Sequence, residues 1–315
     1  AARKLGDMTM TKELRSSLLL LLTAAIWGLA FVAQRIGMDY IGAFTFNALR
    51  FALGSLSLIP VIYFVEGSNK KKGISEDEGE NSRKKIFIYG LIAGSVLFTA
   101  AALQQVGLIY TTAGKAGFIT SLYIVLVPIL GLFSKQKSTG FIWAGAIVAA
   151  IGLYFLSINE DFTIQFGDLL QLIGAFFWAT HILVIGHFAS KVNTLKLSSA
   201  QFATCSLLSL MVALVFEEIQ MVNIISAAVP ILYGGLMSVG VAYTLQVVAQ
   251  RHAKPSHAAI ALSTEAVFAA LGGAIILGEI MSLRGYFGAF LMLAGMLISQ
   301  GDNILDRSKR KKATS

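Results

Sequence analysis

Charged residues and cysteine are both scarce in this chain of 315 residues. Only 13% of the residues are charged, half of the ~25% typical of soluble domains, while 56% are hydrophobic. The one cysteine, Cys205, excludes an intrachain disulfide framework and a cysteine cluster for zinc or an iron–sulfur centre. The composition therefore excludes the ordinary soluble classes and favours an integral membrane protein embedded in a lipid bilayer.

Several other signals are missing as well. Lys and Arg exceed Asp and Glu by a net charge of +8, but no soluble segment is long enough to carry a nucleic-acid surface. No Walker A pattern occurs, and the four histidines lack the spacing of a zinc protease. We therefore expect no nucleic acid, no metal and no other cofactor among the partners.

What the chain has instead is a series of apolar stretches, each long enough to cross a bilayer core of about 30 Å as a helix. We expect ten spans, near residues 16–38, 44–65, 86–109, 112–133, 140–157, 168–189, 197–216, 227–249, 256–277 and 283–300. The segment 66–85 is too charged to pack and is predicted to be a solvated cytoplasmic loop. Residues 1–15 and the basic segment 301–315 are predicted to be cytoplasmic tails.

Basic residues are distributed unequally between the two sides of these spans. If the N-terminus is cytoplasmic, 21 of the 25 Lys and Arg residues lie on the cytoplasmic side. Only Arg35, Lys115 and Arg284 lie on the outer side, and Arg50 lies within the second span. The positive-inside rule then predicts a multi-pass protein of the cytoplasmic (plasma) membrane with both termini inside the cell.

The two halves of the chain resemble each other. Leu21–Trp27 matches Leu172–Trp178, and a glycine spacing in the fifth span recurs in the tenth. We predict two five-span repeats, 16–157 and 168–300, inserted in opposite directions because each holds an odd number of spans. Similar composition of apolar helices is the alternative. The glycines could bring helices together within the chain or in a homodimer, so a monomer and a homodimer both stay open.

Three segments resemble the EamA family of the drug/metabolite transporter superfamily. Ile26-Trp27-Gly28 with Phe31, followed by Asn47-Ala-Leu-Arg50-Phe51, is similar to its N-terminal signature. Tyr110–Pro128 is similar to the region of the third and fourth spans, and Ser263–Glu279 with Gly285 to Gly295 to the C-terminal signature. The resemblance covers about residues 16–300. It implies a ten-helix transporter with a central cavity lined by both repeats.

We therefore expect a secondary active transporter and not an enzyme. It would move a small polar metabolite, an amino acid or amine first, by alternating access coupled to protons or to exchange, with export favoured by the resemblance. The alternatives are an importer or facilitator of another metabolite, such as a nucleoside, a vitamin or a choline-like cation. A membrane-embedded enzyme would need a nucleophile beside a base, and the buried ionisable residues lack that spacing.

Ionisable side chains deep in a span are costly, so each is a candidate functional residue. Glu265, in the ninth span, could bind a cationic group or take up and release a proton. The alternative is a structural role, either an ion pair with Arg50 or a cap on a break in a neighbouring helix. Arg50 shares a helical face with Asn47 and could bind a substrate carboxylate bidentately, or form a structural or gating ion pair.

Aromatic residues near mid-depth are the second group of candidates. Trp27 and Trp178 occupy matching positions in the two repeats, away from the interfacial belts where tryptophan is usual. With Tyr123 and Glu265 they could form a cation–π box, and Phe31 extends the face of Trp27. Plain core packing is the alternative.

Polar residues on inward faces complete the expected site. His181 lies three residues after Trp178 and could carry protons, or form an interior hydrogen bond. Tyr243, Gln246 and Gln250 form a polar stripe at helical spacing.

Four residues near the span ends carry further expectations. Gln104 and Gln105 are adjacent, so at most one should face a cavity. We expect Lys115 to snorkel to the outer surface, with attraction of anions to the cavity mouth as the alternative. We expect Glu279 to pair with Arg284.

Overall fold

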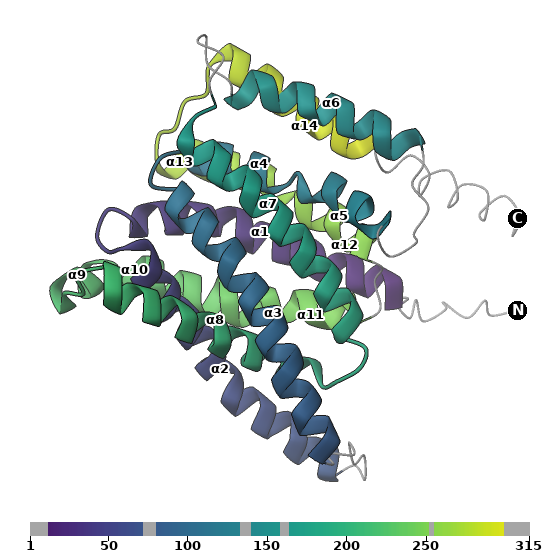
Figure 1. Ribbon diagram of the computed structural model, residues 1–315, viewed down its shortest axis with the longest axis vertical. Coiled ribbons are helices and arrows are strands. Elements are labelled where there is room, and N and C mark those ends of the chain that lie inside the picture. The colour runs from purple at the N-terminus through teal and green to yellow at the C-terminus, as the bar shows by residue number, and fades with distance from the viewer. Residues whose placement is uncertain (1–11, 72–79, 133–139, 158–163, 252–254, 299–315) are drawn as a thin grey trace, which may run out of the picture.

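The computed structural model describes residues 12–71, 80–132, 140–157, 164–251 and 255–298, and its elements in these ranges are helices (Figure 1). The α-helices are α1 (Lys12–Gly37), α2 (Ala43–Lys71), α3 (Glu80–Gly107), α4 (Ala113–Thr120), α5 (Tyr123–Gly131), α6 (Gly140–Ser157), α7 (Phe166–Phe188), α8 (Thr194–Phe216), α9 (Met221–Ser226), α10 (Ala228–Leu232), α11 (Thr244–Gln250), α12 (Pro255–Ser263), α13 (Glu265–Ile276) and α14 (Leu283–Ile298). A π-helix, η2 (Tyr233–Tyr243), joins α10 to α11.

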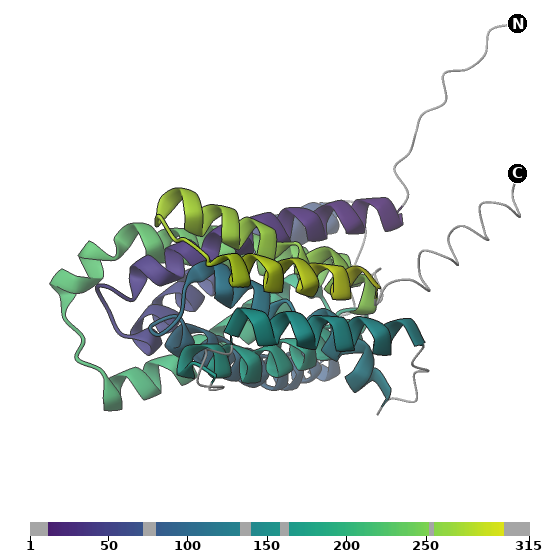
Figure 2. The same ribbon diagram turned by 90° about the horizontal axis from the view of Figure 1, so that it is seen from above.

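Seven helical stretches of the described residues are long and apolar enough to cross a membrane, and Trp143–Leu156 and Ala261–Ile276 are shorter apolar helices. The predicted all-helical membrane protein is therefore confirmed, while seven of the ten expected spans meet this length and composition. Figure 1 shows α6 and α14 as a pair along one edge, α1 through the middle, and α2, α3 and α8 toward the opposite edge. Figure 2 shows the same helices from above.

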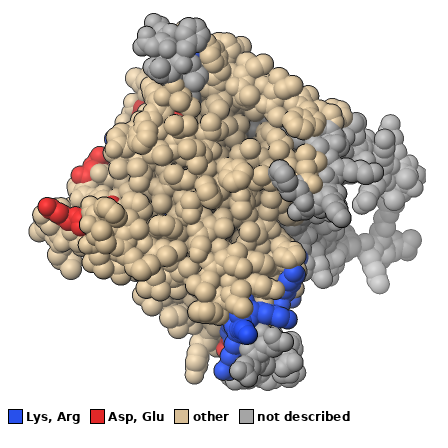
Figure 3. Space-filling view, viewed as in Figure 1, with Lys and Arg blue, Asp and Glu red and all other residues tan. Residues whose placement is uncertain are grey.

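The helices alternate between two ends of the bundle. We call them the Lys12 end, where α1 begins, and the Gly37 end, where α1 stops and α2 begins. Figure 3 shows acidic side chains toward the Gly37 end and basic side chains toward the Lys12 end. Exposed Arg83, Lys84 and Lys85 at the start of α3 belong to the basic end, and Glu218 after α8 to the acidic end.

Helices α2 and α8 run antiparallel and are joined by two reciprocal hydrogen bonds near their middles. Ser55 Oγ donates to the backbone oxygen of Ser199 at 3.0 Å, and Ser206 Oγ donates to that of Ala48 at 2.8 Å. Ser206 follows Ser55 by 151 residues, and Ser199 follows Ala48 by the same 151. One contact therefore becomes the other when the two halves of the chain are exchanged.

The ends of the same pair are joined by carboxylates. Glu217, after α8, accepts hydrogen bonds from the backbone nitrogens of Phe44 and Thr45 at 2.8 and 2.7 Å, at the start of α2. Glu66, near the end of α2, lies 2.5 Å from Lys196 Nζ in the first turn of α8. Glu217 again follows Glu66 by 151 residues, and Lys196 follows Thr45 by 151.

Helices α6 and α14 meet through glycines within the chain. A Cβ on Gly152 would lie 2.6 Å from the backbone nitrogen of Met292 and 2.7 Å from the backbone oxygen of Gly288. A Cβ on Gly295 would lie 2.6 Å from the backbone oxygen of Gly145. These glycines were expected to bring helices together either within the chain or in a homodimer. In the structure they allow close packing of α6 against α14 within the chain.

Three predicted spans are not single α-helices. The span 112–133 is broken at Ser121 and Leu122 between α4 and α5, and the span 256–277 is broken at Thr264 between α12 and α13. The two breaks touch, because Ser121 Oγ donates to the backbone oxygen of Ser263 at 3.2 Å. The span 227–249 changes from α to π geometry between α10 and α11.

The charged loop is shorter than predicted. Helix α2 continues to Lys71 and α3 already begins at Glu80, so both ends of the expected loop 66–85 are helical. Residues 72–79 of that loop, the tail residues 1–11 and 299–315, and His252 lie outside the described residues.

Candidate functional site

A small central cavity of about 30 Å³ lies between the broken helices, the π-helix and α1, α2, α3 and α7. Its lining residues come from both halves of the chain: Trp27, Phe31, Gln34, Arg50, Gln104, Thr120, Tyr123, Trp178, Ile182, Ser238, Tyr243, Gln246 and Glu265. This volume holds about two water molecules, so a metabolite can bind there only when the surrounding helices move apart. Eight residues singled out from the sequence as site candidates reach this wall, and they are discussed first.

The break in the second half places Glu265 at the cavity. Glu265 is the first residue of α13, directly after the break at Thr264, and its side chain is buried. Tyr123, the first residue of α5 at the matching break, donates its hydroxyl hydrogen to Glu265 Oε1 at 2.9 Å. In the described residues no cation pairs with this carboxylate, so the expected alternative of an Arg50–Glu265 ion pair is not found.

Arg50 is held in place by its neighbours while part of its guanidinium is left free. Its Nε donates to Asn47 Oδ1 at 2.9 Å, and Asn47 Nδ2 donates to the backbone oxygen of Ala101 at 3.1 Å. The guanidinium carbon lies 4.7 Å from the ring centre of Phe51 and 5.8 Å from that of Phe46. Nη2 of Arg50 is buried and has no hydrogen-bond partner among the described residues. Asn47 itself does not line the cavity and acts by positioning Arg50.

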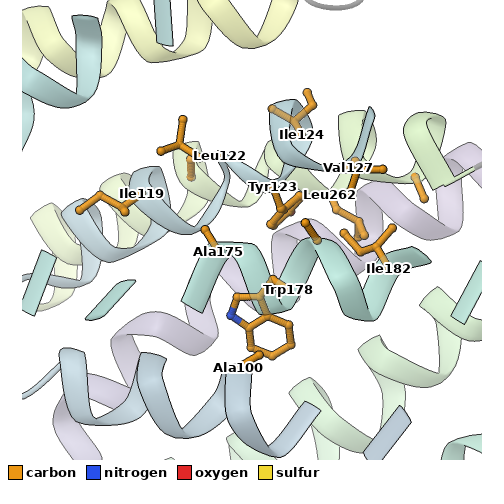
Figure 4. Close-up of a cluster of buried hydrophobic side chains, with 14 of the residues drawn as sticks. Ala100, Ile119, Leu122, Tyr123, Ile124, Val127, Ala175, Trp178, Ile182 and Leu262 are labelled. Atoms are coloured by element: carbon orange, nitrogen blue, oxygen red, sulfur yellow. The ribbon is translucent and has the colours of Figure 1, made fainter. Parts of the chain in front are cut away.

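Aromatic rings form the wall between these two charges. Tyr243 is at their centre, with its ring centroid 4.4 Å from Trp27 and 6.1 Å from Trp178. Trp27 is fixed by its own hydrogen bond, because its Nε1 donates to the backbone oxygen of Ser238 in the π-helix at 3.2 Å. Figure 4 shows Trp178 beside Ala100, with Tyr123 and Ile182 in the same buried cluster.

Two more polar atoms at the cavity lack partners in the described part of the chain. They are Trp178 Nε1, a donor, and Gln246 Oε1, an acceptor. A buried polar atom without a partner is costly unless a ligand or water satisfies it. Together with Arg50 Nη2, the wall therefore presents two donors and one acceptor to a bound molecule.

His181 does not reach the cavity. Its Nε2 lies 2.9 Å from Gln201 Oε1, and its ring lies edge-on behind Trp178 at 6.1 Å between centroids. The structure therefore favours the interior hydrogen bond over direct substrate contact. Gln250 also misses the cavity, because its Nε2 donates to the backbone oxygen of Ile182 at 3.2 Å.

The expected pair of Glu279 with Arg284 is wrong. The Glu279 carboxylate accepts hydrogen bonds from the backbone nitrogens of Ala113 and Gly114 at 2.7 and 3.0 Å, and so caps the start of α4. Gly278, with φ +66°, allows the turn that brings this carboxylate there. Arg284 lies instead over the ring of Tyr154, with 5.4 Å to its centroid.

The expectation that Lys115 snorkels to the surface is also wrong. Lys115 Nζ lies 2.6 Å from Asp168 Oδ2, and the Asp168 side chain is completely buried. Asp168 was missed because it stands at the start of the sixth span, where a carboxylate ordinarily faces water.

Four further cavity residues were also missed by sequence reasoning: Gln34, Thr120, Ile182 and Ser238. Gln34 could have been found, because it follows Trp27 by seven residues on the face that Phe31 already extends. Gln104 lines the cavity and Gln105 does not, as expected of two adjacent residues. No group of three potential metal ligands occurs within the described ranges.

Apolar helices around a cavity with buried polar groups are an arrangement typical of membrane transport proteins. The chain belongs to the EamA-like transporter family, whose model matches residues 14–158 and, a second time, residues 165–300. The resemblance noted from the sequence is thereby confirmed.

Individual relatives agree with this assignment. An uncharacterized transporter of Archaeoglobus fulgidus is 34% identical over 299 residues, covering 93% of this chain and 88% of the relative. The uncharacterized transporter YoaV of Bacillus subtilis is 22% identical over 91% of this chain and 95% of its own length. A crystal structure with 17% identity superposes with a TM-score of 0.65 over 90% of this chain and 96% of that one, which shows a shared fold.

Proposed function

We propose that the protein is a secondary active transporter that carries a small zwitterionic or cationic metabolite, an amino acid or an amine, through the central cavity by alternating access. The observation that carries the substrate class is Arg50 Nη2, a buried donor in the cavity wall that has no hydrogen-bond partner in the described part of the chain. A guanidinium with a free N–H pair is a good receptor for a carboxylate.

The opposite charge is available on the same wall. Among the described residues, Glu265 accepts a hydrogen bond from the hydroxyl of Tyr123 and Gln246 Oε1 has no partner, so an ammonium group has two oxygens to contact. The rings of Trp27 and Tyr243 offer cation–π faces between the two ends. An amino acid would satisfy both ends of the cavity, and a simple amine would satisfy only the Glu265 end.

Alternating access is supported by contacts that exchange between the halves. The Ser55–Ser199 and Ser206–Ala48 hydrogen bonds are related by the same offset of 151 residues that relates Trp27 to Trp178. The family model also matches the chain twice. Two repeats of opposite direction, here 16–157 and 168–300, can exchange conformations and expose one central site to either side.

The proposed orientation places the Lys12 end, with both termini, in the cytoplasm of a cell whose plasma membrane holds the protein. Its support is the concentration of Lys and Arg at that end and of acidic side chains at the Gly37 end. We propose export as the direction and a proton or a counter-substrate as the coupled species that drives it. In this proposal Glu265 binds the substrate and the coupled species in turn.

The test is uptake and counterflow in proteoliposomes with a panel of amino acids and amines, with and without a proton gradient. Glu265→Gln removes the charge while keeping the shape, so we expect gradient-driven transport to be lost and exchange to survive. Glu218→Gln, the same substitution at an exposed position, is the matched control and should transport normally. Wild-type behaviour of Glu265→Gln in both assays would show that Glu265 is structural and that the proposed site is wrong.

A further inference from the structure

Between the cavity and the Gly37 end, side chains of four helices form a continuous hydrogen-bonded layer. Gln104 Nε2 donates to Gln34 Oε1 at 3.0 Å, and Gln171 Nε2 donates to the backbone oxygen of Gln104 at 2.8 Å. Thr120 Oγ1 reaches Gln171 Oε1 at 3.4 Å. This glutamine layer (Gln34, Gln104, Thr120 and Gln171) closes the cavity on that side by joining α1, α3, α4 and α7.

One turn farther out, a second layer joins α4 to α7 by charge. Lys115 Nζ lies 2.6 Å from Asp168 Oδ2, and Thr111 Oγ1 donates to Asp168 Oδ1 at 2.6 Å. Lys115 also donates to Gln165 Oε1 at 3.1 Å. The side chain of Asp168 has no exposed surface, so its charge depends on these partners.

Lys115 separates the cavity from open space. It lines two hollows at the Gly37 end, the larger of about 540 Å³ and bordered by Arg35, Asp39 and Tyr110. Thr120, five residues farther along α4, lines the central cavity. At a helix rise of 1.5 Å per residue the two layers together span only about 7 Å. Opening this short contact would connect the cavity with the surface.

In the other half of the chain, several positions that match these residues carry different residue types. The offset of 151 residues between the halves relates Asp168 to Ser17 and Gln171 to Leu20. For the broken helices, α13 begins 142 residues after α5, an offset that relates Lys115 to His257 and Thr120 to Leu262. Leu20 and Leu262 are buried apolar residues. The positions that match Asp168, Gln171, Lys115 and Thr120 therefore carry Ser, Leu, His and Leu.

We propose that the contact of α4 with α7 is the gate on the Gly37 side, and that the buried Lys115–Asp168 ion pair holds it closed. The inference rests on the proposed function, because a gate presupposes a cavity that opens alternately to the two sides. A buried ion pair suits a two-state contact: both charges are satisfied when it is closed, and water can satisfy both when it is open. In the structure this contact is closed, with Lys115 paired to Asp168.

The test measures how fast a thiol in the cavity reacts from each side of the membrane. Cys205 is buried and is replaced by serine, and Ser238→Cys, in the cavity wall, supplies the reporter. Proteoliposomes are treated with a charged, membrane-impermeant methanethiosulfonate on the side that the Gly37 end faces. We expect slow labelling with the native pair and labelling faster by about tenfold in Asp168→Asn, the change that ~1.4 kcal/mol of lost closed-state stabilisation produces.

Three comparisons make the result specific to the ion pair. Asp39→Asn is the matched control, because Asp39 pairs with Arg35 on the exposed surface of the same end, and it should label slowly. Lys115→Met should accelerate labelling as Asp168→Asn does, and provides the measurement if the latter fails to fold. The exchanged pair, Lys115→Asp with Asp168→Lys, should restore slow labelling.

Each contrary outcome has a distinct meaning. Labelling that is unchanged in Asp168→Asn and Lys115→Met, with a reporter that reacts from the Lys12 side, overturns the gate and leaves the transport proposal standing. If Asp39→Asn accelerates labelling as much as Asp168→Asn does, the gate is also overturned. The faster labelling would then come from a general loosening of the Gly37 end and not from loss of the Lys115–Asp168 pair. A reporter that reacts from neither side in any variant overturns alternating access itself, and the gate with it.

Discussion

Arg50→Lys is the substitution that most directly separates an amino-acid substrate from an amine. Lysine keeps the positive charge but replaces the planar guanidinium by a point charge on a different stem. In the wild type, Asn47 fixes Nε at 2.9 Å and the ring of Phe51 lies 4.7 Å from the guanidinium carbon, so Nη2 is held toward the cavity. Lysine can use neither support in the same way. We therefore expect it to bind a substrate carboxylate with less favourable geometry.

The magnitude follows from the one hydrogen bond that Nη2 can add. A hydrogen bond to a charged partner contributes about 1.5–3 kcal/mol net, which corresponds to a factor of roughly 10 to 100 in affinity. Because the charge stays, the loss should fall toward the lower end of this range. An amine without a carboxylate never contacts Arg50, so its affinity should change by less than about twofold on the same scale.

The assay is equilibrium binding in detergent of an amino acid and of the amine that lacks only its carboxylate. The ratio of the two dissociation constants cancels a general loss of folded protein. Asn47→Ala leaves the arginine but removes its support, and should weaken amino-acid binding by a smaller factor. Equal losses for the amino acid and the amine in Arg50→Lys, or no loss for either, would refute carboxylate binding at Arg50.

Two further predictions concern stability, measured as thermal unfolding midpoints in detergent. Gly152→Ala places a methyl group 2.6 Å from the backbone of α14 and should destabilise the protein by about 1–3 kcal/mol. Gly140→Ala, on the same helix, is the control, because its methyl group meets nothing within 4 Å. Equal unfolding midpoints for the two variants would contradict the packing argument. Glu217→Gln removes the charged acceptor at the start of α2 and should lower the free energy of unfolding by about 1 kcal/mol. Glu218→Gln, at an exposed position, should lower it less. The reverse order would show that the cap is not stabilising.

Much of the cavity wall could be predicted from the sequence, because few polar and aromatic residues stand at mid-depth in apolar spans. Trp27, Arg50, Tyr123 and Glu265 each occupy such a position, and all four line the cavity. The physical reason is that lipid cannot satisfy their polar atoms, so they must face protein or water. His181 follows the same rule, yet a hydrogen bond to a neighbouring helix satisfies it. Residue type and depth alone do not distinguish these two outcomes.

The broken helices could not be predicted, because no glycine or proline stands at either break. Ser121 and Leu122 interrupt one span and Thr264 the other, at residues that are ordinary inside membrane helices. The breaks are stabilised by a contact between them, from Ser121 Oγ to the backbone oxygen of Ser263, and by the Tyr123–Glu265 hydrogen bond. Both bonds join residues 142 positions apart, so no local pattern reveals them.

On the proposed repeat, the positions that match between the halves and those that differ have separate roles. Trp27 and Trp178 match, and both line the cavity. Arg50 corresponds to Gln201 by the offset of 151, and Tyr123 to Glu265 by the offset of 142. The shared aromatic residues therefore shape one cavity, while the unlike residues give it a positive end and a negative end. A strictly symmetrical pair of repeats would present the same group to both ends of a ligand, so recognition of a zwitterion requires that the halves diverge at such positions.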